Sequence, residues 1–405
     1  MFSEEINLCL AVPWLYGPEG HYFGYYKSIF QAASSRKMLV KVWGDKDCSD
    51  LVKKSLPFVP VFQRPIANLT KGVGVLRPAK NILHLLSDLN HVDIEALDSK
   101  WLVFIEPLYH THVLSWALFP WRFHTRRAPT FMVMLRQGYY QSIQKRWGRG
   151  VTYMRIALRL WELSAHFYQV RLVTDSDHLA DEYRSLTSLP LSVLPIPHTE
   201  TDEFPVSQQL AVMSDSVVKF VFLGHMRLEK GFGLLSKAIR QLHEQGKMDR
   251  IRFVLQAIVK HEQGFDVMQS QLQELINLRL LNVQIISEPQ DQDEYVRLLK
   301  DSNFVLLPYA QEAYYSRTSG PFTEALAFGK PVIVTDNTWM SDQLERHGAG
   351  IKFRDQDVDD LARAICEARD NCHDLTRKAY ERRQNWLDYH NPYNFITELR
   401  RIVQR

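Results

Sequence analysis

The chain has 405 residues, which exceeds the size at which one hydrophobic core keeps growing, so two domains are expected. Apolar residues make up 45% and charged residues 23%, as in ordinary globular proteins, and a formal net charge of +3 is too small to indicate a nucleic-acid partner. Four cysteines are too few for a disulfide framework and show no metal-ligand spacing, which favours reduced thiols in a cytoplasmic protein.

Short apolar runs alternate with helical patterns along the whole chain. Runs that are continuously apolar are typical of strands buried on both faces, and strands that alternate with helices predict parallel sheets. The expected strands are 6–14, 38–44, 101–107, 130–136, 171–176, 191–197, 217–224, 251–259, 282–287, 303–309 and 331–336. The polar stretch 198–215 separates two complete sets. We therefore expect an α/β protein with two doubly wound, Rossmann-like domains, 1–200 and 201–385, and a closing helix 386–405 that packs back on the first.

A glycine-containing loop follows the first expected strand. Gly17, Gly20 and Gly24 would let the backbone approach a ligand closely, although an ordinary turn between strand and helix is at least as consistent with them. Further along, His110 and His112 stand just past the end of the strand 101–107. One of these histidines is a candidate for catalysis, and a structural role is the alternative.

A basic loop joins the strand 217–224 to a helix that starts near Gly231. The backbone N–H groups at a helix start are unpaired and favour anions, and Arg227 and Lys230 add positive charge at the same place. This arrangement suits a diphosphate, with Arg gripping two oxygens and Lys acting as a point charge. A solvated basic loop without a ligand is the alternative interpretation.

The stretch 316–336 predicts a capped helix followed by a buried strand. Ser319 or Gly320 can cap the helix, Pro321 suits its first position, and Gly329 ends it. Glu324 is then expected near the first turn, where the helix dipole alone would favour a carboxylate. The functional alternative is that Glu324 accepts hydrogen bonds from the ribose hydroxyls of a nucleotide.

Together, Glu229-Lys230-Gly231 and the segment 324–336 resemble the C-terminal domain of the retaining glycosyltransferases with the GT-B fold. The resemblance covers most of residues 217–350 and implies two Rossmann-like domains that face a central cleft. It implies that Lys230 contacts the donor diphosphate and that Glu324 binds the ribose. The backbone of Ser319 and Gly320 would face the phosphates.

The chain also departs from the family pattern. His225 stands where the family has an arginine, so Arg227 is expected to replace it. Ser316 stands where the family has its first glutamate, and the neighbouring Arg317 is expected to act beside the transferred sugar or the phosphates. In the first domain, the resemblance places Gly20 and Gly24 beside the donor and makes His112 the candidate catalytic histidine.

The resemblance implies a glycosyltransferase that uses a nucleotide diphosphate sugar, with retention of configuration and without metal or cofactor. The acceptor would be a carbohydrate, a lipid-linked sugar or another small molecule. The stretch 291–295, Asp-Gln-Asp-Glu-Tyr, is interpreted as a helix start on the wrong side of the domain for a metal motif. A binding protein without chemistry, and a GT-B epimerase or hydrolase, are the rival functions.

Two stretches bear on contact with a membrane. The N-terminus has acids where a signal peptide would be positive, and no apolar run is long enough to span a bilayer. The stretches 115–127 and 152–163 nevertheless mix aromatic and apolar residues with arginines, which suits a membrane interface. Ordinary packing of surface helices is the alternative. We therefore expect a cytoplasmic protein, and the sequence leaves both alternatives, peripheral membrane contact or none, standing.

Overall fold

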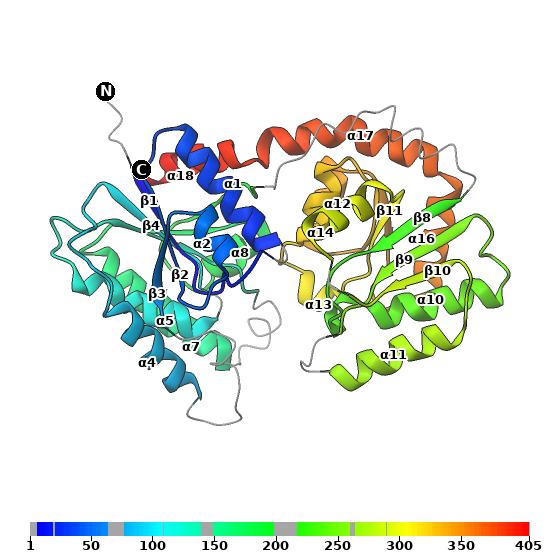
Figure 1. Ribbon diagram of the computed structural model, residues 1–405, viewed down its shortest axis with the longest axis horizontal. Helices are drawn as coiled ribbons and strands as arrows, with labels where there is room; N and C mark the ends of the chain where they lie inside the picture. Colours follow the sequence, from blue (N-terminus) through cyan, green and yellow to red (C-terminus); the bar gives the residue numbers. More distant parts are fainter. Residues whose placement is uncertain are drawn as a thin grey trace. The chain divides into compact units, whose positions relative to one another are not determined.

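The computed structural model describes residues 6–18, 21–63, 77–107, 109–138, 149–197, 217–259, 264–288 and 290–404. The chain divides into two compact units. Unit 1 comprises Met1–Thr199 and His390–Arg405, and unit 2 comprises Glu200–Tyr389 (Figure 1). The expected linker 198–215 lies outside the described residues, and each unit is considered by itself.

Unit 1 is built on a seven-stranded parallel sheet with the order β3-β2-β1-β4-β5-β6-β7. The strands are β1 Asn7–Ala11, β2 Val40–Asp45, β3 Phe58–Phe62, β4 Trp101–Ile105, β5 Thr130–Met134, β6 Val170–Thr174 and β7 Leu191–Val193. The central strands β4 and β5 are buried along their whole length, as their uninterrupted apolar sequences predict. Because the strands are parallel, their carboxyl ends lie at the same edge of the sheet.

Helices cover both faces of this sheet, as in other doubly wound domains. They are α1 His21–Ser35, α2 Asp50–Ser55, α4 Arg77–Leu89, α5 His110–Leu118, α7 Arg149–Ala165, α8 Asp177–Arg184 and α18 Pro392–Val403, with the 3₁₀ turn η1 Phe119–Arg122. In Figure 1, α4, α5 and α7 lie together below the sheet. The C-terminal helix α18 packs on α1, and its Phe395 ring meets the rings of Tyr25 and Phe104.

Unit 2 is built on a six-stranded parallel sheet with the order β10-β9-β8-β11-β12-β13. The strands are β8 Val218–Phe222, β9 Ile251–Gln256, β10 Val283–Ile286, β11 Phe304–Leu307, β12 Val332–Thr335 and β13 Gly350–Phe353. The strand order reverses between β8 and β11. In open parallel sheets, ligands bind outside the carboxyl ends of the strands at such a reversal.

The helices of unit 2 also form two layers. They are α10 Phe232–Glu244, α11 Phe265–Asn277, α12 Gln292–Lys300, α13 Gln311–Tyr314, α14 Gly320–Ala327, α15 Trp339–His347, α16 Val358–Asp370 and α17 Cys372–Tyr389, with the 3₁₀ turn η2 Leu228–Lys230. Helix α10 packs on α11 and α16, whereas α17 packs on α14 and α15 (Figure 1). The predicted class, two parallel-sheet α/β domains, is confirmed.

No helix in the described ranges is both long enough and apolar enough to cross a bilayer.

Candidate functional site

Three segments of unit 2 converge at the carboxyl edge of its sheet, on both sides of the strand-order reversal. The first is the loop 223–231 after β8, the second is the loop 308–319 after β11, and the third is the start of α12. Because neighbouring parallel strands end at the same edge, segments that are far apart in sequence meet there.

Two glycines shape the loop after β8. Gly224 has φ +97°, and its N–H donates to Gln256 Oε1 at 2.6 Å. A Cβ at Gly224 would lie 2.8 Å from Lys230 Nζ. Gly231 has φ +70°, and a Cβ there would lie only 1.8 Å from the carbonyl oxygen of Pro308. Both positions require glycine, because a side chain would displace the lysine or push the loop after β11 away.

Lys230 is the central cation of this edge. The pKa of Lys230 is lowered to about 8, chiefly by burial and then by the positive charge of Arg227, with a smaller contribution from Arg317, while Glu229 and Glu324 act in the opposite sense. Its Nζ lies 5.7 Å from the centre of the Tyr309 ring. The structure thus gathers three cations from two loops, and the two arginines disfavour the charged form of Lys230.

The helix α14 begins at the same edge. Ser319 is its N-cap, with its hydroxyl accepting a hydrogen bond from Phe322 N at 3.4 Å, and Pro321 occupies the first turn. The predicted capping is confirmed. Pro321 has no N–H and Phe322 N donates to the cap, so the N–H of Gly320 is the donor that the start of α14 offers to an anion beside Lys230.

Glu324 is the fifth residue of α14, just past its first turn and close to where the sequence predicted it. The helix dipole acts mainly on the first turn, so it does not account for the position of this carboxylate. Burial raises the pKa of Glu324 to about 7, although the hydroxyl of Tyr295 and the charge of Lys230 both act to lower it. Glu324 is therefore partly protonated near neutral pH, and each hydrogen-bond donor that reaches its carboxylate stabilises the ionised form.

Tyr295, in the first turns of α12, donates a hydrogen bond to Glu324 Oε2. The interpretation that 291–295 lies on the wrong side of the domain is therefore wrong for its last residue. Asp291 and Glu294 form a reciprocal capping box that fixes where α12 starts, and this start sets Tyr295 over α14. The residues of the capping box can be read from the sequence. The strand order that brings α12 next to α14 cannot.

Ser316 and Arg317 lie between β11 and α14. Ser316 stands where the family has its first glutamate, so no carboxylate is present at this position. Its side chain is also buried, so its hydroxyl is not exposed to solvent. The guanidinium of Arg317 lies 4.9 Å from the centre of the Tyr314 ring, and that ring lies 4.5 Å from Tyr309. The Arg227 guanidinium is 3.9 Å from Glu229 and well exposed. The roles expected for these residues stay predictions.

The residues expected from unit 1 belong to the segments that follow β1 and β4. Gly20 lies outside the described residues, and Gly24 is within the first two turns of α1. His112 is buried in the first turn of α5, and burial lowers its pKa to about 4, so it is a neutral imidazole. His110 is only half-buried and stacks on Tyr153 with ring centres 5.4 Å apart. Of the two histidines, His110 is the more accessible.

A buried charge cluster at the carboxyl edge of the unit 1 sheet was not anticipated. Arg136, just after β5, donates to Glu106 after β4, lies 2.9 Å from Asp175 after β6, and donates to the Tyr25 hydroxyl at 2.6 Å. Tyr26 donates to Glu106 as well. Burial raises the pKa of Glu106, and Arg136 opposes that effect. The cluster ties three strand ends to α1.

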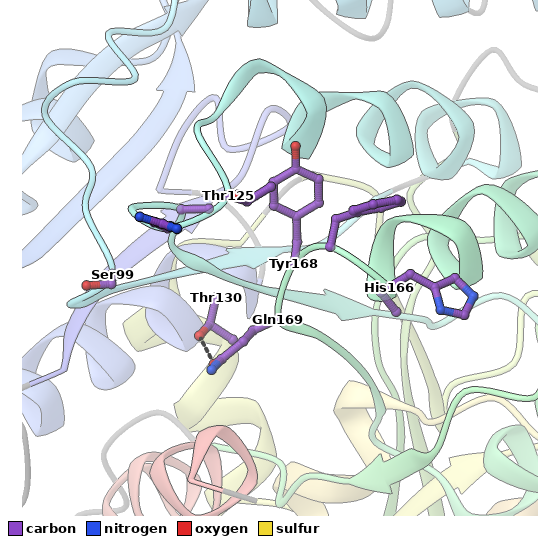
Figure 2. Close-up of a pocket in the computed structure, with 10 residues that line it drawn as sticks. Ser99, Thr125, Thr130, His166, Tyr168 and Gln169 are labelled. Carbon is purple, nitrogen blue, oxygen red and sulfur yellow. Dashed lines mark hydrogen bonds between the residues drawn. The ribbon is translucent and has the colours of Figure 1, made fainter.

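A pocket of about 360 Å³ lies elsewhere on unit 1. Its lining includes Thr130 and Gln169, which are joined by a 2.9 Å hydrogen bond (Figure 2). These residues stand at the start of β5 and just before β6, so the pocket is at the amino edge of the sheet. Ligands of such sheets bind at the opposite edge, and the pocket is not part of the candidate site.

The geometry agrees with comparisons to known proteins. Residues 218–371, which span most of unit 2, match the family described as "Glycosyl transferases group 1". Over 98% of both chains, the structure resembles sucrose-phosphate synthase from Thermosynechococcus elongatus with a TM-score of 0.73 and 12% identity. The chain has the GT-B fold. No curated protein matches it by sequence.

Two further solved structures share this GT-B fold. HepE of Anabaena in complex with UDP-glucose matches with a TM-score of 0.64 and 13% identity, over 98% of this chain and 99% of that chain. WaaG, a glycosyltransferase involved in lipopolysaccharide biosynthesis, matches with a TM-score of 0.60 and 14% identity, over 98% and 99%. The predicted resemblance to GT-B glycosyltransferases is thus confirmed.

Proposed function

We propose that the chain is a glycosyltransferase that moves a sugar from a nucleotide diphosphate sugar to an acceptor. The observation that carries the proposal is the meeting of Lys230 and Glu324, which lie close enough to shift each other's pKa although 94 positions separate them (324 − 230). A cation for a diphosphate and a carboxylate for a ribose then lie at one strand-order reversal. HepE, which shares the fold, is described in complex with UDP-glucose, and this supports a nucleotide-sugar donor.

The site chemistry follows from the leaving group. When the bond between the anomeric carbon and the diphosphate breaks, negative charge grows on the departing phosphate oxygen. In this proposal Lys230, Arg227 and the N–H group at the start of α14 act as preorganised donors that stabilise this charge. Removal of one such preorganised donor commonly lowers kcat by a factor of about 10²–10³. We expect this loss for Lys230→Ala.

The ribose would be held by Glu324. Its carboxylate accepts one hydrogen bond from Tyr295 and has further lone pairs for the two ribose hydroxyls. Charge-assisted bonds of this kind favour the ionised carboxylate, so nucleotide binding would lower the pKa of Glu324 from about 7. Unit 1 would hold the acceptor, with the Arg136 cluster keeping the strand ends and α1 in fixed positions.

Turnover assays separate this function from its rivals. Purified protein is incubated with each of several nucleotide sugars, with and without carbohydrate and lipid-linked acceptors, and release of nucleoside diphosphate is measured. A transferase releases diphosphate much faster with an acceptor. Release that is independent of acceptor would indicate a hydrolase. Conversion of the donor to an isomeric nucleotide sugar without release would indicate an epimerase, and binding with neither change would indicate a binding protein.

Retention of configuration and independence from metal are parts of the same proposal, and both rest on the family resemblance. We expect the product to keep the anomeric configuration of the donor, which NMR of the product determines. We also expect full activity after treatment with a chelator, because Lys230, Arg227 and Arg317 supply positive charge around the leaving group. Loss of activity on chelation, and its recovery with a divalent metal, would overturn this part.

A further inference from the structure

Arg317 is a cation without a carboxylate partner. It is partly buried in the loop between α13 and α14, and its guanidinium lies 4.9 Å from the centre of the Tyr314 ring. Among the described residues, no side chain forms an ion pair or a hydrogen bond with this guanidinium. The sequence 313–323 contains no acid, and the preceding acid, Glu312, is exposed on α13. The charge of Arg317 is therefore stabilised by one aromatic ring and by water, and a ligand that covers it must replace that water.

Lys230 separates Arg317 from Glu324. Glu324 is the fifth residue of α14, whereas Arg317 stands two positions before the N-cap of that helix. Besides burial and Arg227, the groups that shift the pKa of Lys230 include both Arg317 and Glu324. Besides burial, the groups that shift the pKa of Glu324 are Tyr295 and Lys230, and Arg317 is not among them. Because charge interactions weaken with distance, the guanidinium and the carboxylate are farther from each other than either is from the amine.

A nucleotide diphosphate sugar fits this order of groups. Its ribose, its two phosphates and its sugar follow one another in a line. With the ribose on Glu324 and the phosphates on Lys230, the sugar extends past the amine toward Arg317, and this step rests on the proposed function. Each phosphate carries one negative charge, and Lys230 and Arg227 already match the two charges. Arg317 is then a third cation, placed where the sugar lies.

We propose that Arg317 binds a carboxylate on the transferred sugar, so that the donor carries a uronic acid. A guanidinium pairs with a carboxylate through two parallel N–H donors, and such bonds are stronger than bonds to neutral hydroxyls. A neutral sugar would exclude water from Arg317 and offer only hydroxyls in its place, which leaves a covered charge without a counter-charge. The alternative is a third contact to the phosphates, and the two roles predict different specificities.

Paired donors test the proposal with the full chain. Calorimetric titration measures the affinity for UDP-glucose and UDP-glucuronic acid, and for GDP-mannose and GDP-mannuronic acid, with UDP and GDP as references. The members of each pair differ in a carboxylate in place of a hydroxymethyl group. For at least one pair we expect the acidic donor to bind at least about tenfold more tightly than the neutral donor.

Variants of two arginines show which group causes the preference. Arg317→Gln should bring the ratio of acidic to neutral affinity to about one, and Arg317→Lys should keep part of it because the charge remains without the planar fork. Arg227→Gln removes a cation assigned to the phosphates, so it should weaken both donors by a similar factor and leave the ratio as in wild type. Circular dichroism and thermal midpoints confirm that the variants are folded.

Three results would overturn the proposal. The first is equal affinity for the two members of both pairs in wild type. The second is an Arg317→Gln variant that weakens UDP or GDP and both donors of the pair by one common factor, which would assign Arg317 to the phosphates. The third is a protein that binds none of the six ligands. Only this last result also contradicts the proposed function, so the two failures can be told apart.

Discussion

Lys230 carries its positive charge where burial disfavours it. The pKa of Lys230 is lowered to about 8 by burial and by Arg227, so the free protein begins to lose this charge at mildly alkaline pH. A diphosphate reverses the effect, because an anion beside the amine favours the protonated form. Binding above pH 8 must therefore include uptake of a proton.

This linkage predicts a pH-dependent affinity. Between pH 7 and pH 9 the affinity for a nucleoside diphosphate should fall by up to about tenfold, as the protonated fraction of Lys230 falls around its pKa of about 8. Isothermal titration calorimetry measures both the affinity and the proton uptake, the latter from its dependence on the buffer. Lys230→Arg stays charged throughout this range and should lose the dependence. An equal decline in that variant would assign the titration to another group.

Tyr295 controls the ionisation of Glu324 in this account. In Tyr295→Phe the donor to the carboxylate is lost, so the pKa of Glu324 should rise above about 7. For a rise of about one unit, the ionised fraction at pH 7 falls about fivefold, and the affinity for nucleoside diphosphate should fall with it. The ratio of variant to wild-type affinity is measured at several pH values and should return toward one as pH rises. Tyr393→Phe, at an exposed position of unit 1, is the control.

At the scale of elements, the loop after β8 depends on contact between Gly231 and Pro308. Gly231→Ala must accept a φ of +70° and also displace the Pro308 carbonyl, which a Cβ would approach to 1.8 Å. The φ alone costs roughly 1–2 kcal/mol, and the displaced loop adds to it. Gly246→Ala shares a φ of +67° but has open space around its Cβ. In urea unfolding, Gly231→Ala should be the more destabilised variant and should also bind diphosphate less tightly. Equal losses in the two variants would mean that the contact with Pro308 is unimportant.

The Arg136 cluster joins the ends of β4, β5 and β6 to α1. Arg136→Met would leave Glu106 and Asp175 as buried carboxylates without their cation, and removal of one partner of a buried pair costs about 3–5 kcal/mol. Without Arg136 the folded-state pKa of Glu106 rises further above its unfolded value, so folding binds protons and the loss of stability should grow as pH rises from 4 to 7. Urea unfolding at several pH values measures this trend. A loss that does not change with pH would point to packing rather than charge.

The sequence predicted every inner strand of the two sheets and missed two of the four edge strands. Eleven strands of the two sheets were anticipated, because buried parallel strands read as continuous apolar runs. The two that were not, β3 and β13, are edge strands. β3 contains Pro60, which only an edge strand tolerates well, and β13 is a four-residue strand with Gly350 and a lysine in it. Proline, glycine and lysine interrupt the apolar pattern that marks a strand, and an edge strand tolerates them.

At the scale of the whole molecule, the sequence supplied residues of the site but not their neighbours. Lys230 and Glu324 could be predicted because each stands in a local motif that ends a strand or begins a helix. Tyr295 and Arg136 could not, because their partners Glu324 and Glu106 are brought to them by strand order, which no local pattern contains. The same limit applies to the stretch 115–127, where the sequence did not separate the exposed Trp121 from the buried Trp116.

The central claim is that one edge of unit 2 binds a nucleoside diphosphate through Lys230 and Glu324. The most direct test is calorimetric titration of the full chain with UDP, GDP, ADP, CDP and TDP. It is repeated on Lys230→Ala and Glu324→Gln, and on Lys237→Ala and Glu244→Gln at exposed positions of the neighbouring α10. We predict that at least one diphosphate binds wild type and both α10 variants alike, and that both site variants bind it at least about tenfold more weakly. No binding to any diphosphate, or equal affinity in all five proteins, would contradict the account.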